Sequence, residues 1–423
     1  KYAAEYTIDD IVIAIATPNG SLRELIETCL STGCRVRRVT SLEDLSLKGT
    51  QSEVRDLNIA DLLGRSETNL NMTQVAAYFS GKTVMITGGG GSIGGELCRQ
   101  VLTFQPKLVV LYDINENYLY DLFADLKRHH GDTLRDMLLL RVGSVQDAAR
   151  LDEVMDAFPF DVVLHAAAHK HVPLLEDSPV QAVKNNVFGT YTVASRAAAH
   201  GVKRFVMIST DKAVNPTNVM GATKRAAEKV VAAVGSASGT EFVSVRFGNV
   251  LGSHGSVVPL FERQIRAGGP VTVTHPDIVR YFMTIPEAAS LVLQAAVLAK
   301  GGELFVLDMG QPVLIRELAE RMIQLYTAQG GQNRVEIAYT GLRPGDKLYE
   351  ELLTDDESLV KTELDKIYVT KPDRITEAEL QEMLKTLRKC MDERGDMRAC
   401  LHEIIPSFRE ADEVNGQAAG AKA

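Results

Sequence analysis

The sequence predicts an α/β protein built on a doubly wound parallel sheet, with a smaller C-terminal region and a truncated N-terminal α/β piece. The first observation behind this prediction is a series of short apolar runs between residues 83 and 247, most of them separated by helical stretches. Runs that are apolar throughout are typical of parallel strands covered on both faces. The second observation is a glycine-rich segment at residues 87–94, directly after the first run.

The N-terminal segment, residues 1–73, has strand–helix–strand texture. An apolar run covers residues 11–16, a helical pattern covers 22–30, and a second β-like run covers 34–39. The chain begins with Lys1 rather than Met, and this piece lacks opening strands. We therefore expect a fragment of a longer protein, or a processed one.

The main unit is expected to span residues 74–374. Its predicted strands are Thr83–Thr87, Leu108–Tyr112, Leu138–Val142, Val162–Leu164, Phe205–Ile208 and Phe242–Phe247. From about residue 250 a smaller region is expected, with short strands at Val271–Thr274, Leu304–Leu307 and Val335–Tyr339. Residues 375–423 are expected to form a helical segment with a flexible Ala/Gly-rich tail from Gly416.

Charge and cysteine usage exclude several classes of protein. The chain has 55 acidic and 46 basic residues, a net charge of -9, which disfavours nucleic-acid binding. The sequence has no apolar run of the roughly 18 residues that span a bilayer. Its five cysteines include no CxxC pair. A disulfide framework and a zinc site are therefore disfavoured, and a reducing cytoplasmic compartment fits.

The glycine-rich segment Thr87-Gly88-Gly89-Gly90-Gly91-Ser92-Ile93-Gly94 opens a helix. Glycine at 88, 91 and 94 permits a tight turn and a close approach of backbone N–H groups to a pyrophosphate. Asp113 ends the next strand, where a carboxylate binds the ribose hydroxyls and repels a 2′-phosphate. Together these features predict a Rossmann-type dinucleotide site, with NAD favoured over NADP. The segment lacks the Gly-Lys-Ser/Thr ending of a P-loop, which disfavours nucleotide hydrolysis.

A second group of polar residues, Ser209-Thr210-Asp211-Lys212, ends the apolar run Phe205–Ile208. The carboxyl ends of strands carry the ligands in open α/β sheets. Asp beside Lys is either a surface ion pair or a general acid next to a general base. Eight residues later, Met220-Gly221-Ala222-Thr223-Lys224 opens a helix that would carry Lys224 toward the dinucleotide.

Several segments carry a family resemblance: Thr87–Gly94, His165–Pro173, Asn185–Thr190, Ser209–Lys212, Arg246–Ser253 and Leu342–Lys347. In them the chain resembles the extended short-chain dehydrogenases/reductases that act on nucleotide sugars. Within that group it resembles the CapD-like UDP-N-acetylglucosamine 4,6-dehydratases of bacterial polysaccharide synthesis and protein glycosylation. The resemblance covers about two-thirds of the chain.

The N-terminal piece resembles the second half of a Rossmann-like domain that precedes the enzyme in long, membrane-anchored members. This implies a parent protein at the cytoplasmic face of the inner membrane, of which the present chain is a soluble fragment without a membrane segment. The role of residues 1–73 stays open. The resemblance also implies a homo-oligomer.

The implied reaction converts UDP-N-acetylglucosamine to a 4-keto-6-deoxy sugar nucleotide. Hydride leaves C4 for a tightly bound NAD, water is lost across C5–C6, and hydride returns to C6. NAD is thus regenerated in each turnover. Met at position 220 and the N-terminal extension resemble the branch that retains the C5 configuration.

The resemblance implies a role for each residue at the strand end. Lys212 is the candidate base at C5, and the positive charges of Lys224 and the nicotinamide ring would help it to lose its proton. Asp211 is the candidate acid for the 6-hydroxyl, and Thr210 can bond the 4-oxygen. Met220 stands where the superfamily has the Tyr of YxxxK, and a thioether cannot accept the 4-hydroxyl proton. Asp211, Thr210 and a water remain as acceptors.

The remaining candidates form two groups. The candidate cofactor contacts are Thr87, Gly88, Gly91, Ser92, Ile93, Gly94, Asp113, Ser144, Val145, Ala166, Ala167 and Lys224. The candidate substrate contacts in the region from about 250 and beside the cofactor are Lys170, Asn249, Arg280, Arg343 and Glu350. Arg suits the bidentate grip of a diphosphate. His165, His169 and His171 look like a metal cluster, but His165 ends an apolar strand and no metal is expected.

Three further questions stay open on the sequence. Asn186 either orients the strand ends near the cofactor or caps a helix. A UDP-sugar 4-epimerase shares the fold, the cofactor and the first hydride step, but it needs no C5 base, so the Asp211-Lys212 pair argues against it. A non-catalytic NAD-binding sensor or scaffold is favoured by Met220 and disfavoured by the intact Asp211, Lys212 and Lys224.

Overall fold

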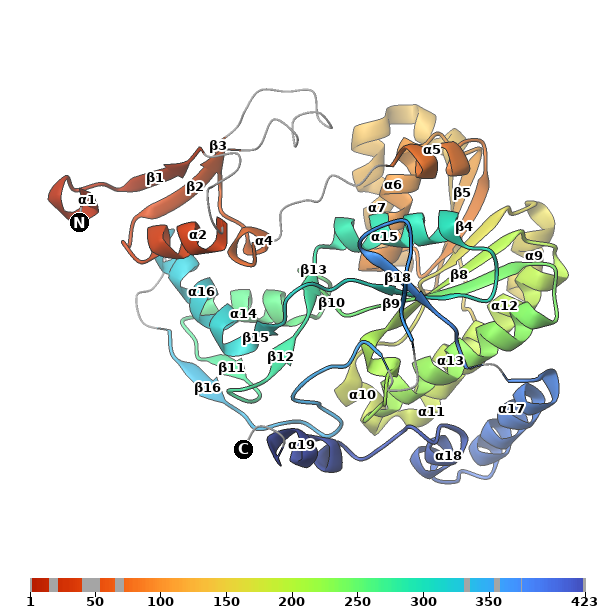
Figure 1. The fold of residues 1–423 in the computed structure, drawn as a ribbon. Coiled ribbons are helices and arrows are strands. Elements are labelled where there is room, and N and C mark those ends of the chain that lie inside the picture. The colour runs from red at the N-terminus through yellow and green to blue at the C-terminus, as the bar shows by residue number, and fades with distance from the viewer. Residues whose placement is uncertain are drawn as a thin grey trace. The chain divides into compact units, whose positions relative to one another are not determined.

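The computed structural model describes residues 2–14, 22–39, 54–64, 72–330, 335–353, 358–373 and 375–420 (Figure 1). The chain forms two compact units that interleave along the sequence. The first unit comprises Lys1–Leu70, Asn249–Glu287 and Gly310–Leu342. The second comprises Asn71–Gly248, Ala288–Met309 and Arg343–Ala423.

The second unit is built on a nine-stranded sheet in the order β17-β18-β14-β9-β8-β7-β4-β5-β6, counted over the described residues. Its strands are β4 (Thr83–Thr87), β5 (Leu108–Asp113), β6 (Leu138–Val142), β7 (Val162–His165), β8 (Arg204–Thr210), β9 (Glu241–Phe247), β14 (Leu304–Leu307), β17 (Val360–Lys361) and β18 (Ile367–Thr370). All pairs from β6 to β14 are parallel, whereas β18 runs antiparallel to both β14 and β17. The predicted doubly wound parallel sheet is confirmed.

One predicted strand lies elsewhere than expected. Leu304–Leu307 was expected in the smaller region after residue 250, but it extends the main sheet beside β9. Its four residues are all buried. An apolar strand of this kind needs cover on both faces, which the main sheet provides.

The strand order places the functional edge of the sheet. From β4 the chain proceeds to β5 and β6 on one side, then returns to β7 and β8 on the other side. The order therefore reverses between β4 and β7. In open α/β sheets, ligands bind outside the carboxyl ends of the strands at such a reversal.

Helices cover both faces of this sheet. In chain order they are α5 (Thr73–Phe79), α6 (Ser92–Thr103), α7 (Glu116–His130), η1 (Gly131–Thr133), α8 (Leu134–Met137), α9 (Ala148–Ala157), α10 (Val172–Asp177), α11 (Pro179–Ala182), the π-helix η2 (Val183–Phe188), α12 (Gly189–Ala199), η3 (Asp211–Ala213), α13 (Val219–Ser236), α15 (Ile285–Leu298), α17 (Glu377–Asp392), α18 (Met397–Ile404) and α19 (Ala411–Gly420). Figure 1 shows α6 and α15 along one face and α12 and α13 along the other.

Helix α13 is enclosed on several sides. Its residues belong to one hydrophobic core with those of α12, α17 and α18 (Figure 1). Leu380, Leu384, Leu387 and Leu401 bring the apolar faces of α17 and α18 into that core. The C-terminal helices are therefore part of the second unit's core. Helix α19 continues to Gly420, so the Ala/Gly-rich segment from Gly416 is helical as far as that residue.

The first unit combines three separate stretches of the chain. Its elements are α1 (Tyr2–Glu5), β1 (Asp10–Ile13), α2 (Leu22–Leu30), β2 (Arg35–Val39), β3 (Val54–Asp56), α4 (Ile59–Leu62), β10 (Asn249–Val250), α14 (Val257–Arg266), β11 (Val271–Val273), β12 (Val279–Arg280), β13 (Phe282–Met283), β15 (Val313–Leu314), α16 (Ile315–Ala328) and β16 (Ile337–Tyr339). The N-terminal strand–helix–strand pattern is present, although residues 15–16 of its apolar run lie outside the described residues.

A shared core joins these stretches. Ile26 and Leu62 belong to the same buried cluster as Phe261, Leu318 and Met322. The N-terminal piece thus packs on residues that follow position 250. The predicted domain boundaries at residues 73 and 374 stay predictions.

No helix within the described residues is long and apolar enough to cross a membrane.

Candidate functional site

The glycine loop between β4 and α6 packs so closely against neighbouring backbone that side chains would not fit at two of its positions. Gly88 has a φ of 68°, and a Cβ there would lie 2.6 Å from the backbone nitrogen of Ala167. A Cβ on Gly94 would lie 2.1 Å from the carbonyl oxygen of Gly88. No side chain caps α6, whose N-cap residue is Gly91. This N-terminus fits the pyrophosphate of a dinucleotide.

Asp113, at the end of β5, braces the glycine loop, and its contact with a ribose hydroxyl stays a prediction. Its Oδ2 accepts a hydrogen bond from Gly90 N at 2.9 Å, and its Oδ1 accepts one from Asn115 N at 2.9 Å. Each carboxylate oxygen can accept a second bond, so Asp113 braces the loop and can still bind a ribose hydroxyl. The sequence predicted the ribose contact but not the bracing of the loop.

The other candidate cofactor residues follow the carboxyl ends of β6 and β7. Ser144 accepts the Tyr112 hydroxyl on its carbonyl oxygen at 2.9 Å, and Val145 is buried. Ala166 N donates to the carbonyl oxygen of Thr87 at 3.0 Å. The structure therefore places these residues on the same edge of the sheet as the glycine loop. Their contact with a cofactor stays a prediction.

His165 lies inside this edge as a neutral side chain. Its Nδ1 is 2.7 Å from Thr87 Oγ1, and its Nε2 is 3.0 Å from Thr190 Oγ1. Burial and then the nearby Lys224 charge lower the pKa of His165 to about 3. Among the described residues, no group of three His, Cys, Asp or Glu side chains could hold a metal ion. His165 instead joins β7 to the start of the glycine loop and to α12.

The end of β8 brings together the predicted acid and base. Thr210 Oγ1 donates to Asp211 Oδ1 at 2.8 Å, and Lys212 Nζ lies 3.0 Å from the same oxygen. Asp211 is fully buried, and its Oδ2 has no hydrogen-bond partner among the described residues. A buried polar atom without a partner is unfavourable unless a ligand supplies one. The arrangement is therefore suited to a substrate hydroxyl.

Helix α13 brings Lys224 to the same strand end. Lys224 Nζ donates to the carbonyl oxygen of Ile208 at 2.7 Å. Burial lowers the pKa of Lys224 to about 8, although the Glu228 carboxylate opposes that shift. The helix approaches closely because residue 221 is glycine: a Cβ there would lie 2.1 Å from the carbonyl oxygen of Lys212. Met220 is buried in the hydrophobic core.

Asn186 connects the loop after β7 to α13. Its Oδ1 accepts from His169 N at 2.8 Å, and its Nδ2 donates to His169 O at 3.0 Å and to Thr223 Oγ1 at 3.1 Å. These bonds make it a bridge between a loop and a helix. Of the two alternatives left open by the sequence, the structure supports orientation of the site over helix capping.

The segment after Arg343 also reaches the strand end. Glu350 Oε1 is 3.7 Å from Lys212 Nζ, and both side chains are largely buried. Lys347 Nζ donates to Val214 O at 3.0 Å. The sequence suggested Glu350 as a substrate contact but gave no sign that it approaches Lys212. Lys170 and Arg343 are both exposed, and desolvation lowers the pKa of Lys170.

Asn249 and Arg280 belong to the first unit. Asn249 lies in β10, and its backbone N donates to Tyr281 O at 3.0 Å. Arg280 is largely buried in β12, where its Nη1 donates to Val279 O at 2.8 Å. The assignment of both residues to the substrate stays a prediction.

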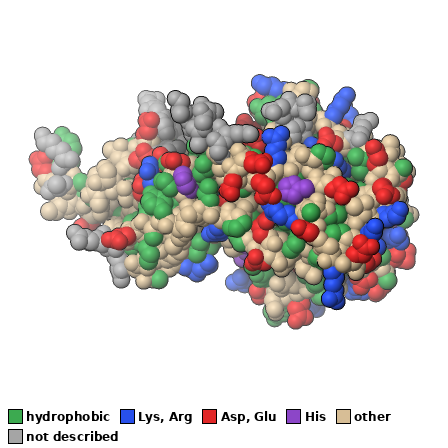
Figure 2. All heavy atoms as spheres, turned by 90° about the horizontal axis from the view of Figure 1, so that it is seen from below, with side chains coloured by type: hydrophobic (Ala, Val, Ile, Leu, Met, Phe, Trp, Pro, Cys, Tyr) green, Lys and Arg blue, Asp and Glu red, His purple; other side chains and the backbone are tan. Residues whose placement is uncertain are grey.

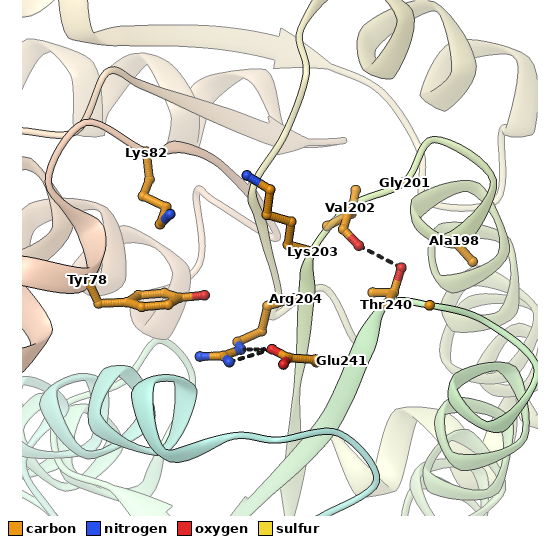
Figure 3. Close-up of a pocket in the computed structure, with 10 residues that line it drawn as sticks. Tyr78, Lys82, Ala198, Gly201, Val202, Lys203, Arg204, Thr240 and Glu241 are labelled. Carbon is orange, nitrogen blue, oxygen red and sulfur yellow. Dashed lines mark hydrogen bonds and ion pairs between the residues drawn. The ribbon is translucent and has the colours of Figure 1, made fainter.

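A cavity of about 530 Å³ lies at the opposite edge of the sheet, beside the amino ends of β4, β8 and β9 (Figure 3). Its charged groups are used within the protein. Arg204 pairs with Glu241, and Lys203 pairs with Asp161 at 2.7 Å. The Tyr78 ring lies 4.8 Å from Arg204 Cζ. Nothing here resembles the acid, base and phosphate-binding groups of the other edge.

The visible surface carries both signs of charge. Figure 2 shows Lys and Arg side chains interspersed with Asp and Glu side chains on this face.

This combination of sheet, glycine loop and lysine-bearing helix is that of the extended short-chain dehydrogenases/reductases. A family model described as "Polysaccharide biosynthesis protein" matches residues 84–372. This range is more than half of the chain, and the chain belongs to that family.

Two curated relatives are much longer than this chain. It is 47% identical to the "Probable polysaccharide biosynthesis protein EpsC" of Bacillus subtilis, over 86% of this chain and 60% of that protein. It is 46% identical to the "Capsular polysaccharide biosynthesis protein CapD" of Staphylococcus aureus, over 90% of this chain and 64% of that protein. The chain thus spans less than two thirds of the length of both relatives.

Relatives with named activities fall into two classes. A "UDP-N-acetylglucosamine 4,6-dehydratase (inverting)" of Campylobacter jejuni is 32% identical over 70% of this chain and 84% of that protein. A "UDP-glucose 4-epimerase" of Rickettsia rickettsii is 34% identical over 66% of this chain and 80% of that protein. The structure of Pen from Bacillus thuringiensis is 35% identical, with a TM-score of 0.64, and covers 73% of this chain and 98% of its own. Identity alone does not separate dehydratase from epimerase.

Proposed function

We propose that the chain is an NAD-dependent 4,6-dehydratase that converts UDP-N-acetylglucosamine to UDP-4-keto-6-deoxy-N-acetylglucosamine, with retention at C5, for bacterial glycan synthesis. The observation that carries the proposal is the adjacent, buried pair Asp211 and Lys212 at the end of β8. Loss of water across C5–C6 needs a base at C5 and an acid at the 6-hydroxyl. A 4-epimerase needs neither.

NAD fits the glycine loop, α6 N-terminus and Asp113, and when bound it would accept hydride from C4 and return it to C6. Gly88, Gly91 and the first turn of α6, Ser92 to Gly94, would hold the pyrophosphate. Lys224 would bond the nicotinamide ribose with its ammonium group. Asp113 would bind the adenosine ribose.

A residue of this chain can be assigned to each of the two proton transfers at C5 and C6. Lys212 would remove the C5 proton, which is acidic beside the C4 ketone. Asp211 would donate a proton to the 6-hydroxyl, which leaves as water. Since an acid must hold a proton before it donates one, the unpartnered Asp211 Oδ2 is the oxygen placed to carry it.

The proton of the 4-hydroxyl needs a separate acceptor, because Met220 is a thioether within the core. Thr210 Oγ1 already donates to Asp211 Oδ1 at 2.8 Å. A proton could thus pass from the 4-oxygen through Thr210 to an ionised Asp211, directly to Asp211, or to a water. In the first two routes the proton that Asp211 gains from the 4-hydroxyl is the one that it later donates to the leaving 6-hydroxyl. The structure supports the first route by supplying its hydrogen bond.

The test is an NMR measurement of UDP-N-acetylglucosamine turnover in D₂O without added cofactor. We expect a 4-keto-6-deoxy product with deuterium at C5 and an unchanged C5 configuration. Formation of only the 4-epimer would establish the epimerase instead. An untouched sugar, even with added NAD, would favour a protein that binds NAD without using it.

Lys212→Ala and Asp211→Asn test the two named groups. Each should lower kcat at least about 100-fold while NADH binding is kept, because loss of an acid or base typically costs 10²–10⁴-fold. Lys203→Ala is the matched control, since Lys203 is an exposed lysine just before the same strand. It should change kcat less than about twofold. Equal effects of Lys203→Ala and Lys212→Ala would contradict the assigned base.

The five substrate contacts, the homo-oligomer and the membrane-anchored parent protein stay predictions. Arg343→Ala should raise KM for the UDP-sugar if Arg343 grips the diphosphate.

A further inference from the structure

A buried ion pair lies directly behind the predicted catalytic strand end. Glu228 Oε1 accepts from Arg246 Nε at 2.7 Å and from Ser209 Oγ at 2.6 Å, and Glu228 Oε2 accepts from Arg246 Nη2 at 2.7 Å. Arg225 Nη1 lies 3.3 Å from Oε2. All four side chains are almost completely buried. The sequence contained no motif that linked these residues.

The pair joins three elements at one point. Ser209 on β8 and Arg246 on β9 are direct neighbours in the register of the sheet. Glu228 holds both from α13, one helical turn after Lys224. Lys224 in turn bonds the carbonyl oxygen of Ile208, the residue before Ser209. Two consecutive residues of β8 are therefore fixed by two successive turns of α13, immediately before Thr210–Lys212.

The environment of Glu228 keeps its carboxylate ionised. Burial alone would raise the pKa of Glu228, but Arg246, Arg225 and the Ser209 hydroxyl together lower it to about 2. The carboxylate is therefore ionised throughout the neutral range. A buried ion pair is weak evidence for a stabilising role, because desolvation offsets much of the attraction. Its location next to the cofactor lysine suggests another use.

We propose that Glu228 is a positioning residue that holds Ser209 and Arg246 in register behind Thr210–Lys212 and supplies the negative charge that keeps Lys224 protonated when the cofactor binds. This rests on the proposed assignment of Lys224 to the cofactor.

The other carboxylates bonded to α13 are held elsewhere on the helix: Glu176 accepts from Val219 N at 2.7 Å, and Asp373 pairs with Arg225 at 2.6 Å. His165 on β7 is neutral, as its lowered pKa shows. Arg246 on β9 is cationic, and Asp211 on η3 bonds Thr210 and Lys212. Arg225, on α13 itself, is cationic too. Burial lowers the pKa of Lys224 to about 8, and Glu228 opposes the shift. Without that carboxylate the ammonium would lose its proton at lower pH.

The sheet provides a matched control. Arg204 and Glu241 form a second ion pair on the same two strands and are also direct register neighbours, at the opposite edge (Figure 3). Glu241→Gln therefore removes one carboxylate that pairs with an arginine at the other end of β8 and β9. The two sites differ in burial as well as in location, because the Glu241 side chain is 41% exposed whereas Glu228 is almost completely buried.

The first measurement is the affinity for NADH, from its fluorescence, as a function of pH. For the unmodified protein and Glu241→Gln, affinity should fall as pH rises through about 8, where Lys224 loses its proton. For Glu228→Gln the affinity for NADH should begin to fall at lower pH. At about pH 8 the binding of NADH by this variant should be at least about threefold weaker than in Glu241→Gln. Glu228→Asp, which keeps the charge, should restore the original midpoint.

The second measurement tests alignment. Ser209→Ala removes one hydrogen bond and no charge, so its NADH midpoint should not move, while kcat falls about tenfold and KM changes less than about twofold. If Glu228→Gln does not fold, this variant carries the test. An identical pH midpoint in Glu228→Gln and Glu241→Gln, or an unchanged kcat in Ser209→Ala, would overturn the proposal.

The two proposals fail in different ways. If the protein does not dehydrate the sugar, the proposed function is wrong. The NADH titration of Glu228→Gln still shows whether Glu228 controls the protonation of Lys224. If the pH midpoint for NADH binding is not shifted in Glu228→Gln and the unmodified protein dehydrates the sugar normally, only the proposed role of Glu228 is wrong.

Discussion

At the residue scale, the absence of a single carbon atom decides whether the glycine loop can form. Gly88 combines a positive φ with backbone atoms less than 3 Å from the position of a Cβ. The two constraints are independent, because the first concerns strain within the residue and the second a collision with Ala166 and Ala167. Only glycine satisfies both.

Gly88→Ala should therefore destabilise the protein by about 2 kcal/mol or more and weaken NADH binding at least about tenfold. Urea unfolding and NADH titration measure the two effects. Gly131→Ala is the control, since Gly131 has a φ of 65° but no atom within 4 Å of a Cβ position. Its free energy of unfolding should fall by about 1 kcal/mol because of backbone strain alone, and it should bind NADH normally. Equal binding by both variants would show that the loop does not contact the cofactor.

The residues themselves differed in how far the sequence could predict them. The spacing of Gly88, Gly91 and Gly94 predicted the loop, because glycine permits the tight turn and close backbone approach that such a loop needs. The hydrogen bond between Ser209 and Glu228 could not be predicted in this way, because the two residues are 19 positions apart and neither belongs to a recognisable motif. Their contact depends on the register of β8 and on the face of α13 turned toward it.

At the scale of elements, strands were predictable where both of their faces are buried. Continuous apolar runs at β4 to β9 reveal parallel strands directly. The edge strand β17 has only exposed residues, Val360 and Lys361, and β18 lies between β17 and β14, antiparallel to both. Short edge strands carry no such pattern and were not predicted. The packing partner of Leu304–Leu307 was also not predictable, because an apolar run does not specify its neighbour.

The helices α17 and α18 illustrate a role that amphipathic pattern alone does not reveal. Their apolar faces pack onto α13, the helix that carries Lys224. Arg398 of α18 also reaches Glu176 at 2.6 Å, and Glu176 accepts from the first N–H of α13, at Val219. A distant C-terminal segment thereby helps to hold helix α13.

Leu387→Ala should reduce the free energy of unfolding by about 2 to 5 kcal/mol, because it leaves a cavity at a fully buried position between α17 and the core. Chemical denaturation measures the loss. Lys385→Ala, on an exposed position of the same helix, should change stability by less than about 0.5 kcal/mol. Similar values for the two variants would mean that α17 does not contribute to this core.

At the scale of the whole molecule, the interleaving of two units is the main feature. Arg321 of α16 illustrates how separate stretches form one unit. Its Nη2 pairs with Glu27 at 2.7 Å, and its Nη1 donates to the carbonyl oxygen of Leu62 at 3.4 Å. One largely buried guanidinium thus contacts two elements from the first 70 residues.

Arg321→Ala should destabilise the first unit by about 1 to 3 kcal/mol, since it removes both the ion pair with Glu27 and the hydrogen bond to the carbonyl oxygen of Leu62. Hydrogen exchange should accelerate in residues 22–39 and 315–328 and stay unchanged in 83–113. Arg316→Ala is the control, because Arg316 forms only an exposed pair with Glu320 on the same helix. Uniform acceleration across both units would contradict the division of the chain at these boundaries.

The interleaved order has a consequence for synthesis of the chain on the ribosome. Asp211 and α13 emerge early, but the strands β14 and β18 that complete their sheet follow at residues 304–307 and 367–370. The helices that cover α13 emerge later still, at residues 377–404. Until then the nascent chain exposes the apolar side of α13 to the cell, where it is a target for chaperones and for aggregation. The strand end that carries Asp211 and Lys212 therefore becomes enclosed only after residues 377–404 have been synthesised.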